Sequence, residues 1–278
     1  MTERELLKRP RGKYPRYASE FADLEALIEK YVLPGSIPAK PILDRTKLVM
    51  TQGSCFAENI AYVLKANKVS VYNLTVPEFV NSPRANELFY RHLMDPALPY
   101  ANPSQAKIFA PVQALRDFDW SKVHLFLFTM GVAPYFVRDG AETFDMTSES
   151  GDGDDMKYPT VAEVEASIDF IFSVVRKLNP AIKIVFTLSP VPLNSFLGAN
   201  SGVTADCVSK SILRVAAHNY LQRGLPDTYY WPSFEIIRWL GAHLPPVFGA
   251  DDGLARHVNN AMINLVVKLF LKHYAIMT

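Results

Sequence analysis

The chain has 278 residues, of which 49% are apolar and 21% are charged. This composition is ordinary for a folded globular protein and argues against wholesale disorder. The formal net charge of +1 provides no overall electrostatic field, so neither nucleic acid nor an anionic membrane surface is expected as a partner.

Cysteines, motifs and apolar stretches indicate the compartment and the absence of cofactors. Cys55 and Cys207 are far apart and form neither a disulfide framework nor a paired-cysteine metal motif. No His-x-x-His spacing or Gly-x-x-x-x-Gly-Lys loop occurs, so we expect no metal or nucleotide cofactor. No secretory signal is visible, and the apolar stretches are shorter than the roughly 18 residues that span a bilayer. We therefore expect a cytoplasmic protein without a membrane span.

Two regions differ in character along the chain. Residues 1–45 are rich in proline and charge, with one expected helix near residues 20–28, and we interpret them as an extension. The basic run at residues 8–16 is expected to be a solvated arm. From residue 46 to residue 278, short apolar runs alternate with amphipathic segments, which is typical of one domain built from βα units.

The apolar runs predict five strands, at residues 47–52, 69–74, 124–129, 183–188 and 228–231. Helical periodicity and capping signals predict helices that follow residue 53 and that cover residues 82–94, 160–178, 205–223, 234–240 and 259–274. Residues 135–146 resemble a small hairpin. The fold class is therefore a three-layer α/β/α sandwich with a mostly parallel five-stranded sheet, flavodoxin-like in form. Ligands are expected at the carboxyl ends of its strands.

The turn after the first strand, Gly53-Ser54-Cys55, lies at that edge of the sheet. Glycine permits a tight turn, and the free N–H groups of the following helix could stabilise an oxyanion. Ser54 could act there as a nucleophile or could cap the helix. Cys55 is its rival, because a thiol at a helix amino terminus has a lowered pKa, although it could also be a small buried apolar residue. Adjacent residues point in different directions, so only one can face a catalytic base.

The pentapeptide Gly53-Ser54-Cys55-Phe56-Ala57 resembles the signature of the GSCFA family, a branch that is similar to the SGNH hydrolases. Further pieces that share the resemblance are spread along the chain at residues 129–131, 188–193, 209–214 and 231–235, and at His257. Together they reach from about residue 48 to residue 264, so the likeness concerns the whole domain. It implies an SGNH hydrolase-like form of the sandwich.

The resemblance also implies a catalytic set. In the resembled hydrolases a serine after the first strand attacks an acyl ester, a late histidine removes its proton, and an aspartate three residues earlier orients the histidine. Ser54 and His257 match, but position 254 is leucine. The nearest acids are Asp251 and Asp252, of which we favour Asp252. A Ser-His dyad without an acid is the alternative.

Binding residues are implied less directly. The resembled enzymes use a glycine after the second strand and an asparagine after the third, and this chain departs from both. Asn73 and Gly131 occupy the corresponding regions, and Gly53 precedes Ser54 in the first turn. We therefore expect an oxyanion site from backbone N–H groups of Ser54 and near Gly131, with the Asn73 amide. Lys210 and Arg214, four residues apart on one helix, could hold a phosphate or carboxylate at the rim, or could form a solvated face.

The implied function is that of a serine ester hydrolase or O-acyltransferase, acting on an acylated carbohydrate through an acyl-Ser54 intermediate. The sequence does not separate hydrolysis from transfer, because both share the acyl-enzyme. The acyl donor could be a small-molecule or glycan ester, or acyl-CoA. The alternatives are a Cys55-dependent CoA acyltransferase and a binding or scaffold protein that has kept the fold and lost the reaction.

Overall fold

A central sheet of five parallel strands organises the computed structural model, which describes residues 12–78, 81–100, 103–138, 141–143 and 154–276. The strands are β1 (Leu48–Gly53), β2 (Val71–Thr75), β3 (Val123–Met130), β7 (Lys183–Leu188) and β8 (Thr228–Tyr230). They pair in the order β2-β1-β3-β7-β8, and every pair is parallel. The predicted strands and fold class are confirmed. This order is that of flavodoxin, in which the strand order reverses between β1 and β3.

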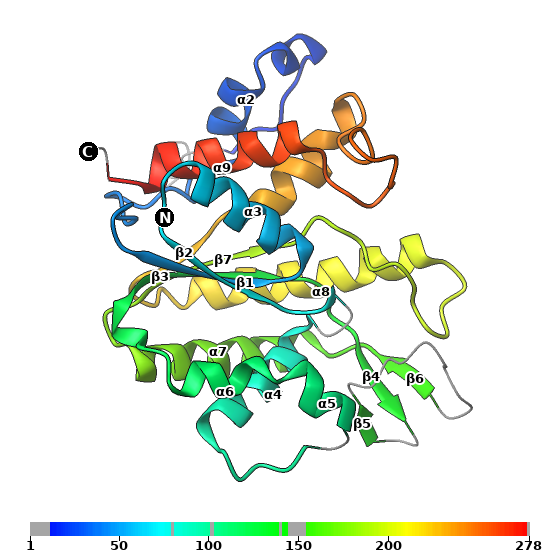
Figure 1. Cartoon of the computed structure of the whole chain (residues 1–278). Coiled ribbons are helices and arrows are strands. Elements are labelled where there is room, and N and C mark those ends of the chain that lie inside the picture. The colour runs from blue at the N-terminus through cyan, green and yellow to red at the C-terminus, as the bar shows by residue number, and fades with distance from the viewer. Residues whose placement is uncertain (1–11, 79–80, 101–102, 139–140, 144–153, 277–278) are drawn as a thin grey trace, which may run out of the picture.

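Helices cover both faces of this sheet (Figure 1). One face carries α3 (Cys55–Ala66), the π-helical η4 (Glu235–Leu240) and α9 (Asn260–Tyr274). The other carries α4 (Pro83–Met94), α6 (Pro111–Arg116), α7 (Val161–Leu178) and α8 (Gly202–Gln222). Because successive strand residues point to opposite faces, Leu125 and Leu127 pack on the first layer whereas Phe126 and Phe128 pack on the second. A sheet buried on both faces explains the continuous apolar runs.

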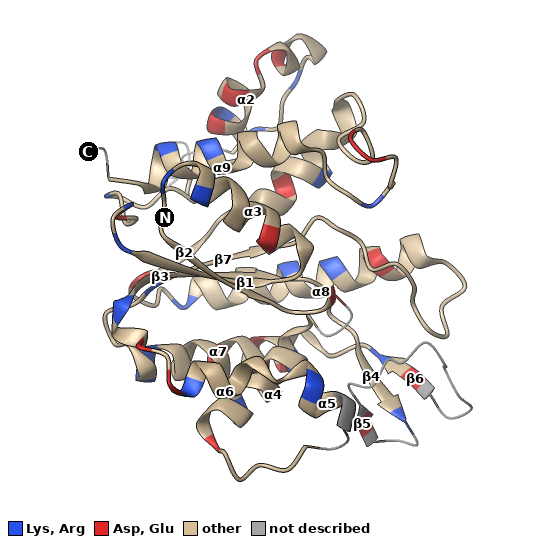
Figure 2. Cartoon of the chain, viewed as in Figure 1, with Lys and Arg blue, Asp and Glu red and all other residues tan. Residues whose placement is uncertain are grey.

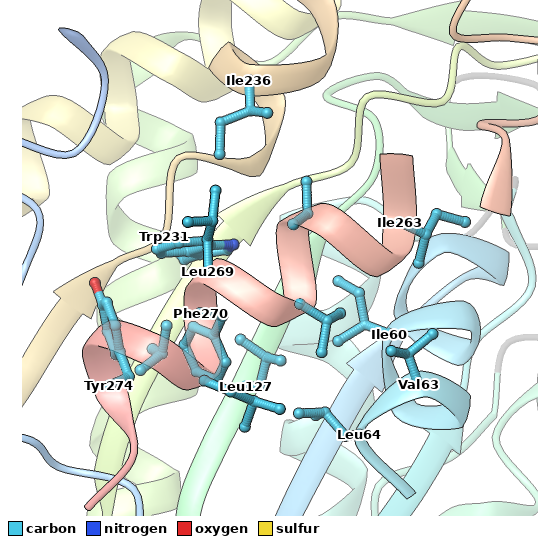
Figure 3. Packing of buried hydrophobic residues seen from close by; sticks show 14 of the residues in the cluster. Ile60, Val63, Leu64, Leu127, Trp231, Ile236, Ile263, Leu269, Phe270 and Tyr274 are labelled. Carbon is cyan, nitrogen blue, oxygen red and sulfur yellow. The ribbon is translucent and has the colours of Figure 1, made fainter. Parts of the chain in front are cut away.

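The packing between α3 and α9 fixes the end of the chain over the sheet (Figure 3). Ile60 and Val63 of α3 share one buried cluster with Ile263 of α9. At the other end of α9, the Trp231 ring meets those of Phe270 and Tyr274 edge-on, with ring centroids 5.3 and 5.4 Å away. The helix is thus anchored along its length, so the loop that precedes it is held over the carboxyl edge of the sheet.

The amino-terminal segment packs on α9 instead of leaving the domain. The expected single helix is divided into η1 (Ala18–Ala22) and α2 (Leu24–Tyr31), because the Asp23 side chain accepts a hydrogen bond from the Ala26 N–H and starts a new helix. Ile28 is fully buried in the α3/α9 cluster. Residue Leu43 then forms a parallel bridge with Ala275. Residues before position 46 therefore contribute to the core.

The predicted hairpin is part of a small antiparallel sheet. β4 (Tyr135–Arg138) pairs with β5 (Ala141–Thr143), and β4 also pairs with β6 (Asp154–Lys157), a strand that the sequence analysis did not predict. Residues 139–140 and 144–146 of the predicted hairpin lie outside the described residues. The sheet has the order β5-β4-β6 and extends from the end of β3 (Figure 1).

Three short helical segments fill residues 103–122, where no element was predicted. They are α5 (Pro103–Ile108), α6 and the 3-10 turn η3 (Trp120–Lys122), and a further 3-10 turn, η5 (Gly241–His243), follows η4. Apolar side chains of this stretch are buried in the layer that contains α4, α6, α7 and α8: Phe109, Val112, Leu115 and Trp120. Basic and acidic residues are interspersed over both helical layers (Figure 2). Among the described residues, no helix has the length and apolar character needed to cross a bilayer.

Candidate active site

The site is built on the turn between β1 and α3. Gly53 ends the strand with φ = +153°, and a Cβ there would lie 2.8 Å from the Ala57 Cβ and 2.9 Å from the Thr129 Cβ. Only glycine fits both this backbone conformation and this space. Ser54 follows in extended conformation as the N-cap, and Cys55 is the first residue of α3. The tight turn brings the first N–H groups of α3 to the carboxyl edge of the sheet.

The Ser54 side chain does not cap this helix. It makes no hydrogen bond to a first-turn N–H, and the residue is only 3% exposed. Its hydroxyl instead lowers the pKa of the neighbouring Cys55 thiol. The capping interpretation of Ser54 is therefore wrong, and Ser54 and Cys55 form one local unit.

Cys55 lines a pocket of about 470 Å³ at the amino terminus of α3. The α3 residues Phe56 and Asn59 and the post-β7 residue Val191 form part of its wall, and the loop before α9 closes the rest with Asp251, Asp252 and residues 257–260. Ser54, the neighbouring residue, does not line this pocket. Of the two candidate nucleophiles, the cysteine is thus the one in the pocket with His257.

His257 and Asp252 form a hydrogen-bonded pair in this wall. The His257 Nδ1 lies 2.6 Å from Asp252 Oδ2, and the Leu254 N–H donates to Asp252 Oδ1 at 2.9 Å. These two hydrogen bonds, that from His257 first, lower the pKa of Asp252. Asp251 is directed elsewhere, since its carboxylate accepts from the Asn260 N–H at 2.6 Å. Asp252, favoured from the sequence, is therefore the acid that contacts His257 across a five-residue interval, and its catalytic role stays a prediction.

An ion pair stands beside the Cys55 thiol. Arg256 Nη1 lies 2.8 Å from Glu78 Oε1, in the segment after β2, and 3.0 Å from the carbonyl oxygen of Pro192, after β7. Burial raises the pKa of the Cys55 thiol, and the Glu78 carboxylate raises it further. Hydrogen bonds from the Phe56 N–H and the Ser54 hydroxyl act in the opposite direction, as does the Arg256 charge. The resting thiol is thus neutral at neutral pH.

Two of the expected oxyanion donors are engaged elsewhere. The Gly131 N–H donates to the Asn81 carbonyl oxygen at 3.0 Å. The Asn73 side chain accepts from Thr51 Oγ1 at 2.7 Å and donates to Thr75 Oγ1 at 2.8 Å. Neither Gly131 nor Asn73 lines the pocket. The structure therefore contradicts these two expectations and leaves the amino terminus of α3 as the source of N–H donors.

Lys210 and Arg214 do not line the pocket that contains Cys55 and His257. Lys210 is 2% exposed, and its ammonium donates to the carbonyl oxygens of Gly131, at 2.5 Å, and Val191, at 2.8 Å. Burial lowers the pKa of Lys210 to about 8. Arg214 is paired with Glu235 and lies over the Tyr230 ring at 4.8 Å. Lys210 instead ties the segments after β3 and β7 together beneath the pocket.

Sequence reasoning missed a buried polar chain behind the turn. Tyr90 donates to Gln52 Oε1 and Gln52 Nε2 to Asn86 Oδ1, both at 2.6 Å. Asn86 donates to Asn81 Oδ1, and Asn81 to the Thr129 carbonyl oxygen, both at 3.3 Å. The chain links β1, α4 and β3 at the switch point. Its one sequence signal was Gln52, a long polar side chain at the end of an apolar run.

Comparison with known proteins identifies the family. The model of the GSCFA family matches residues 119–270, just over half of the chain, and the protein belongs to this family. The matched segment runs from β3 into α9 and includes His257, but it does not reach the pentapeptide at residues 53–57. A search of curated proteins gave no match.

Several solved structures are similar to the chain at low identity. A GDSL-like lipase from Bacteroides thetaiotaomicron is 13% identical, with 89% of this chain and 97% of that chain covered and a TM-score of 0.44. A carbohydrate esterase family 2 enzyme from Corynascus thermopiles is 11% identical, with 85% and 68% covered and a TM-score of 0.46. A family two carbohydrate esterase from Clostridium thermocellum is also 11% identical, with 84% and 66% covered and a TM-score of 0.44. At these values the likeness assigns no substrate to this chain.

Proposed function

We propose that the protein is an acyl-transfer enzyme that cleaves or transfers an O-acyl group through a covalent acyl-enzyme at the Ser54-Cys55 turn. One observation carries this proposal. His257, hydrogen-bonded to Asp252 at 2.6 Å, shares one pocket with a nucleophilic side chain at the start of α3. A nucleophile, a base and a group that orients the base are the three parts that covalent acyl transfer needs.

Each part has a defined role in this reaction. Asp252 engages His257 Nδ1, so Nε2 is the nitrogen that takes the proton of the nucleophile and later returns it to the leaving alcohol. Asp252 holds the ring in that tautomer and stabilises the imidazolium that forms. The N–H groups in the first turn of α3 stabilise the oxyanion of the tetrahedral intermediate, aided by the positive end of the helix dipole.

The pocket favours an uncharged, hydroxyl-rich ester such as an acylated carbohydrate. A volume of about 470 Å³ accommodates a ligand of one or two sugar units. Asn59 and Asn260, both exposed on its wall, offer amide donors and acceptors for hydroxyl groups. No lysine or arginine is among the residues that line it, so nothing in the wall would neutralise the phosphates of acyl-CoA. This supports an O-acyl glycan or small ester as donor.

Turnover of p-nitrophenyl acetate by wild type and His257→Ala tests the proposal. We expect the substitution to lower kcat/KM by at least about a hundredfold, the usual effect of losing a general base. His218→Ala, which removes an exposed histidine of α8, is the matched control and should behave as wild type. Equal rates for the His257→Ala and His218→Ala proteins, or hydrolysis no faster than that by unfolded protein, would mean a binding or scaffold protein instead.

A further inference from the structure

The two adjacent candidate nucleophiles have unequal access to the pocket. Cys55 is half-buried and lines the pocket together with His257. Ser54 is 3% exposed and lies behind the pocket wall, at the carboxyl end of β1. A substrate carbonyl that enters the pocket therefore meets the thiol first, whereas it would reach the Ser54 hydroxyl only after the turn had moved.

The turn gives the two side chains different functions. The Ser54 hydroxyl and the Phe56 N–H both lower the pKa of the Cys55 thiol, against the larger effect of burial. Both groups therefore favour the thiolate, and the amino terminus of α3 adds its dipole. Because Ser54 is buried and does not line the pocket, it is placed to support the sulfur and not to meet the substrate.

We propose that Cys55, and not Ser54, carries the acyl group, and that the Ser54 hydroxyl is a positioning group that stabilises the attacking sulfur. This inference rests on the proposed function, because it names the nucleophile of the same site. It differs from the serine mechanism that the sequence resemblance implies. It also makes the intermediate a thioester instead of an oxygen ester.

The step is balanced as a general-base reaction. The Cys55 thiol proton moves to His257 Nε2 while the sulfur adds to the ester carbonyl. Collapse of the tetrahedral intermediate breaks the C–O bond, and the imidazolium proton goes to the departing alkoxide. Water, or an acceptor alcohol, then loses a proton to His257 as it adds to the thioester. Cleavage of the C–S bond expels the sulfur, which takes the imidazolium proton and returns as the thiol.

The surroundings of the thiol explain why it needs the base. Burial and the Glu78 carboxylate keep it protonated, while Arg256 and the buried Lys210 lie within electrostatic reach of it. Asp252 and Asp251 line the same pocket beside His257. The sulfur therefore becomes nucleophilic only as His257 takes its proton, in contrast to cysteine enzymes that hold a preformed thiolate.

Intact-mass analysis after rapid mixing with p-nitrophenyl acetate, followed by peptide mapping, tests the assignment. We expect one acetyl group on Cys55 that neutral hydroxylamine removes, because hydroxylamine cleaves thioesters under conditions that spare serine esters. Cys55→Ala should abolish the adduct and lower turnover by at least about a hundredfold. Ser54→Ala should keep the adduct on Cys55 and lower turnover by about tenfold or less. Cys207→Ala, which removes the exposed second thiol, is the control and should change neither.

The outcomes separate this inference from the proposed function. A hydroxylamine-resistant acetyl group on Ser54, lost in Ser54→Ala and retained in Cys55→Ala, would overturn the inference and leave the acyl-enzyme intact. No adduct and no turnover in folded wild-type protein would overturn both. Thermal unfolding monitors folding of each variant, and Cys55→Ser provides a nearly isosteric second test, for which we expect the same loss of the hydroxylamine-sensitive adduct.

Discussion

At the scale of single residues, burial raises the pKa of the Cys55 thiol, and the ion pair beside it adjusts that pKa further. Glu78 raises the pKa of the thiol and Arg256 lowers it, and the two side chains are paired at 2.8 Å. Removal of either partner also frees the other charge, so both effects of each substitution have the same sign. The two variants should therefore move the pKa of Cys55 in opposite directions.

We expect Glu78→Gln to lower the pKa of Cys55 and Arg256→Gln to raise it. The pH dependence of alkylation by iodoacetamide measures this pKa, because only the thiolate reacts. The midpoint should shift to lower pH in Glu78→Gln and to higher pH in Arg256→Gln, by about half a unit to one unit each. The Cys207→Ala background removes the other thiol from the measurement. Coincident or reversed midpoints would contradict the electrostatic assignment.

At the scale of elements, the β1–α3 turn depends on Gly53. An added Cβ would meet the Ala57 and Thr129 Cβ atoms at 2.8 and 2.9 Å, with φ at +153°. We expect Gly53→Ala to lower the free energy of unfolding by about 3 kcal/mol, from backbone strain and overpacking together. Urea unfolding followed by circular dichroism measures this loss.

Gly198→Ala is the matched control for that substitution. Gly198 also has a positive φ, +71°, but a Cβ there meets nothing within 4 Å. Gly198→Ala should lower the free energy of unfolding by about 1 kcal/mol, because it adds backbone strain without a steric clash. If the two substitutions destabilise the protein equally, the close approach of α3 and β3 to Gly53 is not what restricts that position.

The elements themselves were largely predictable from the sequence, whereas their hydrogen-bond partners were not. Apolar runs and capping residues are local signals, so the five central strands and the Thr160–Glu163 capping box of α7 were found. β6 was missed because Asp154–Lys157 is short and polar, with no alternation to detect. The Gly131 N–H bonds to Asn81, 50 positions earlier in the chain, and no local pattern reports such a partner.

The same limit applies to the candidate site. Spacing placed Lys210 and Arg214 on neighbouring positions of one helix, but it could not tell that Lys210 enters the core and bonds two carbonyl oxygens. Adjacency showed that Ser54 and Cys55 point in different directions. Which of them faces His257 depends on the conformation of Gly53 and on the packing of α3 against α9, and both are tertiary properties.

At the scale of the whole molecule, the site joins segments from both ends of the domain. Cys55 begins the first helix after β1, and His257 lies in the last loop, before α9. Their proximity depends on the seating of α9 on α3 and on the amino-terminal segment that covers α9, where Glu25 and Glu29 pair with Lys268 and Lys272. The flavodoxin-like strand order places this meeting point at the switch between β1 and β3.

The most direct test of the central claim, a covalent acyl-enzyme, is product partitioning between water and methanol. Acetyl esters with different leaving groups, such as p-nitrophenyl acetate, phenyl acetate and an acetylated sugar, would each be turned over in the same methanol concentration. If all pass through one acyl-enzyme, the ratio of methyl acetate to acetate is the same for every ester, whichever step limits the rate. A ratio that changes with the leaving group would show that water and methanol attack the bound ester directly, and it would contradict the account.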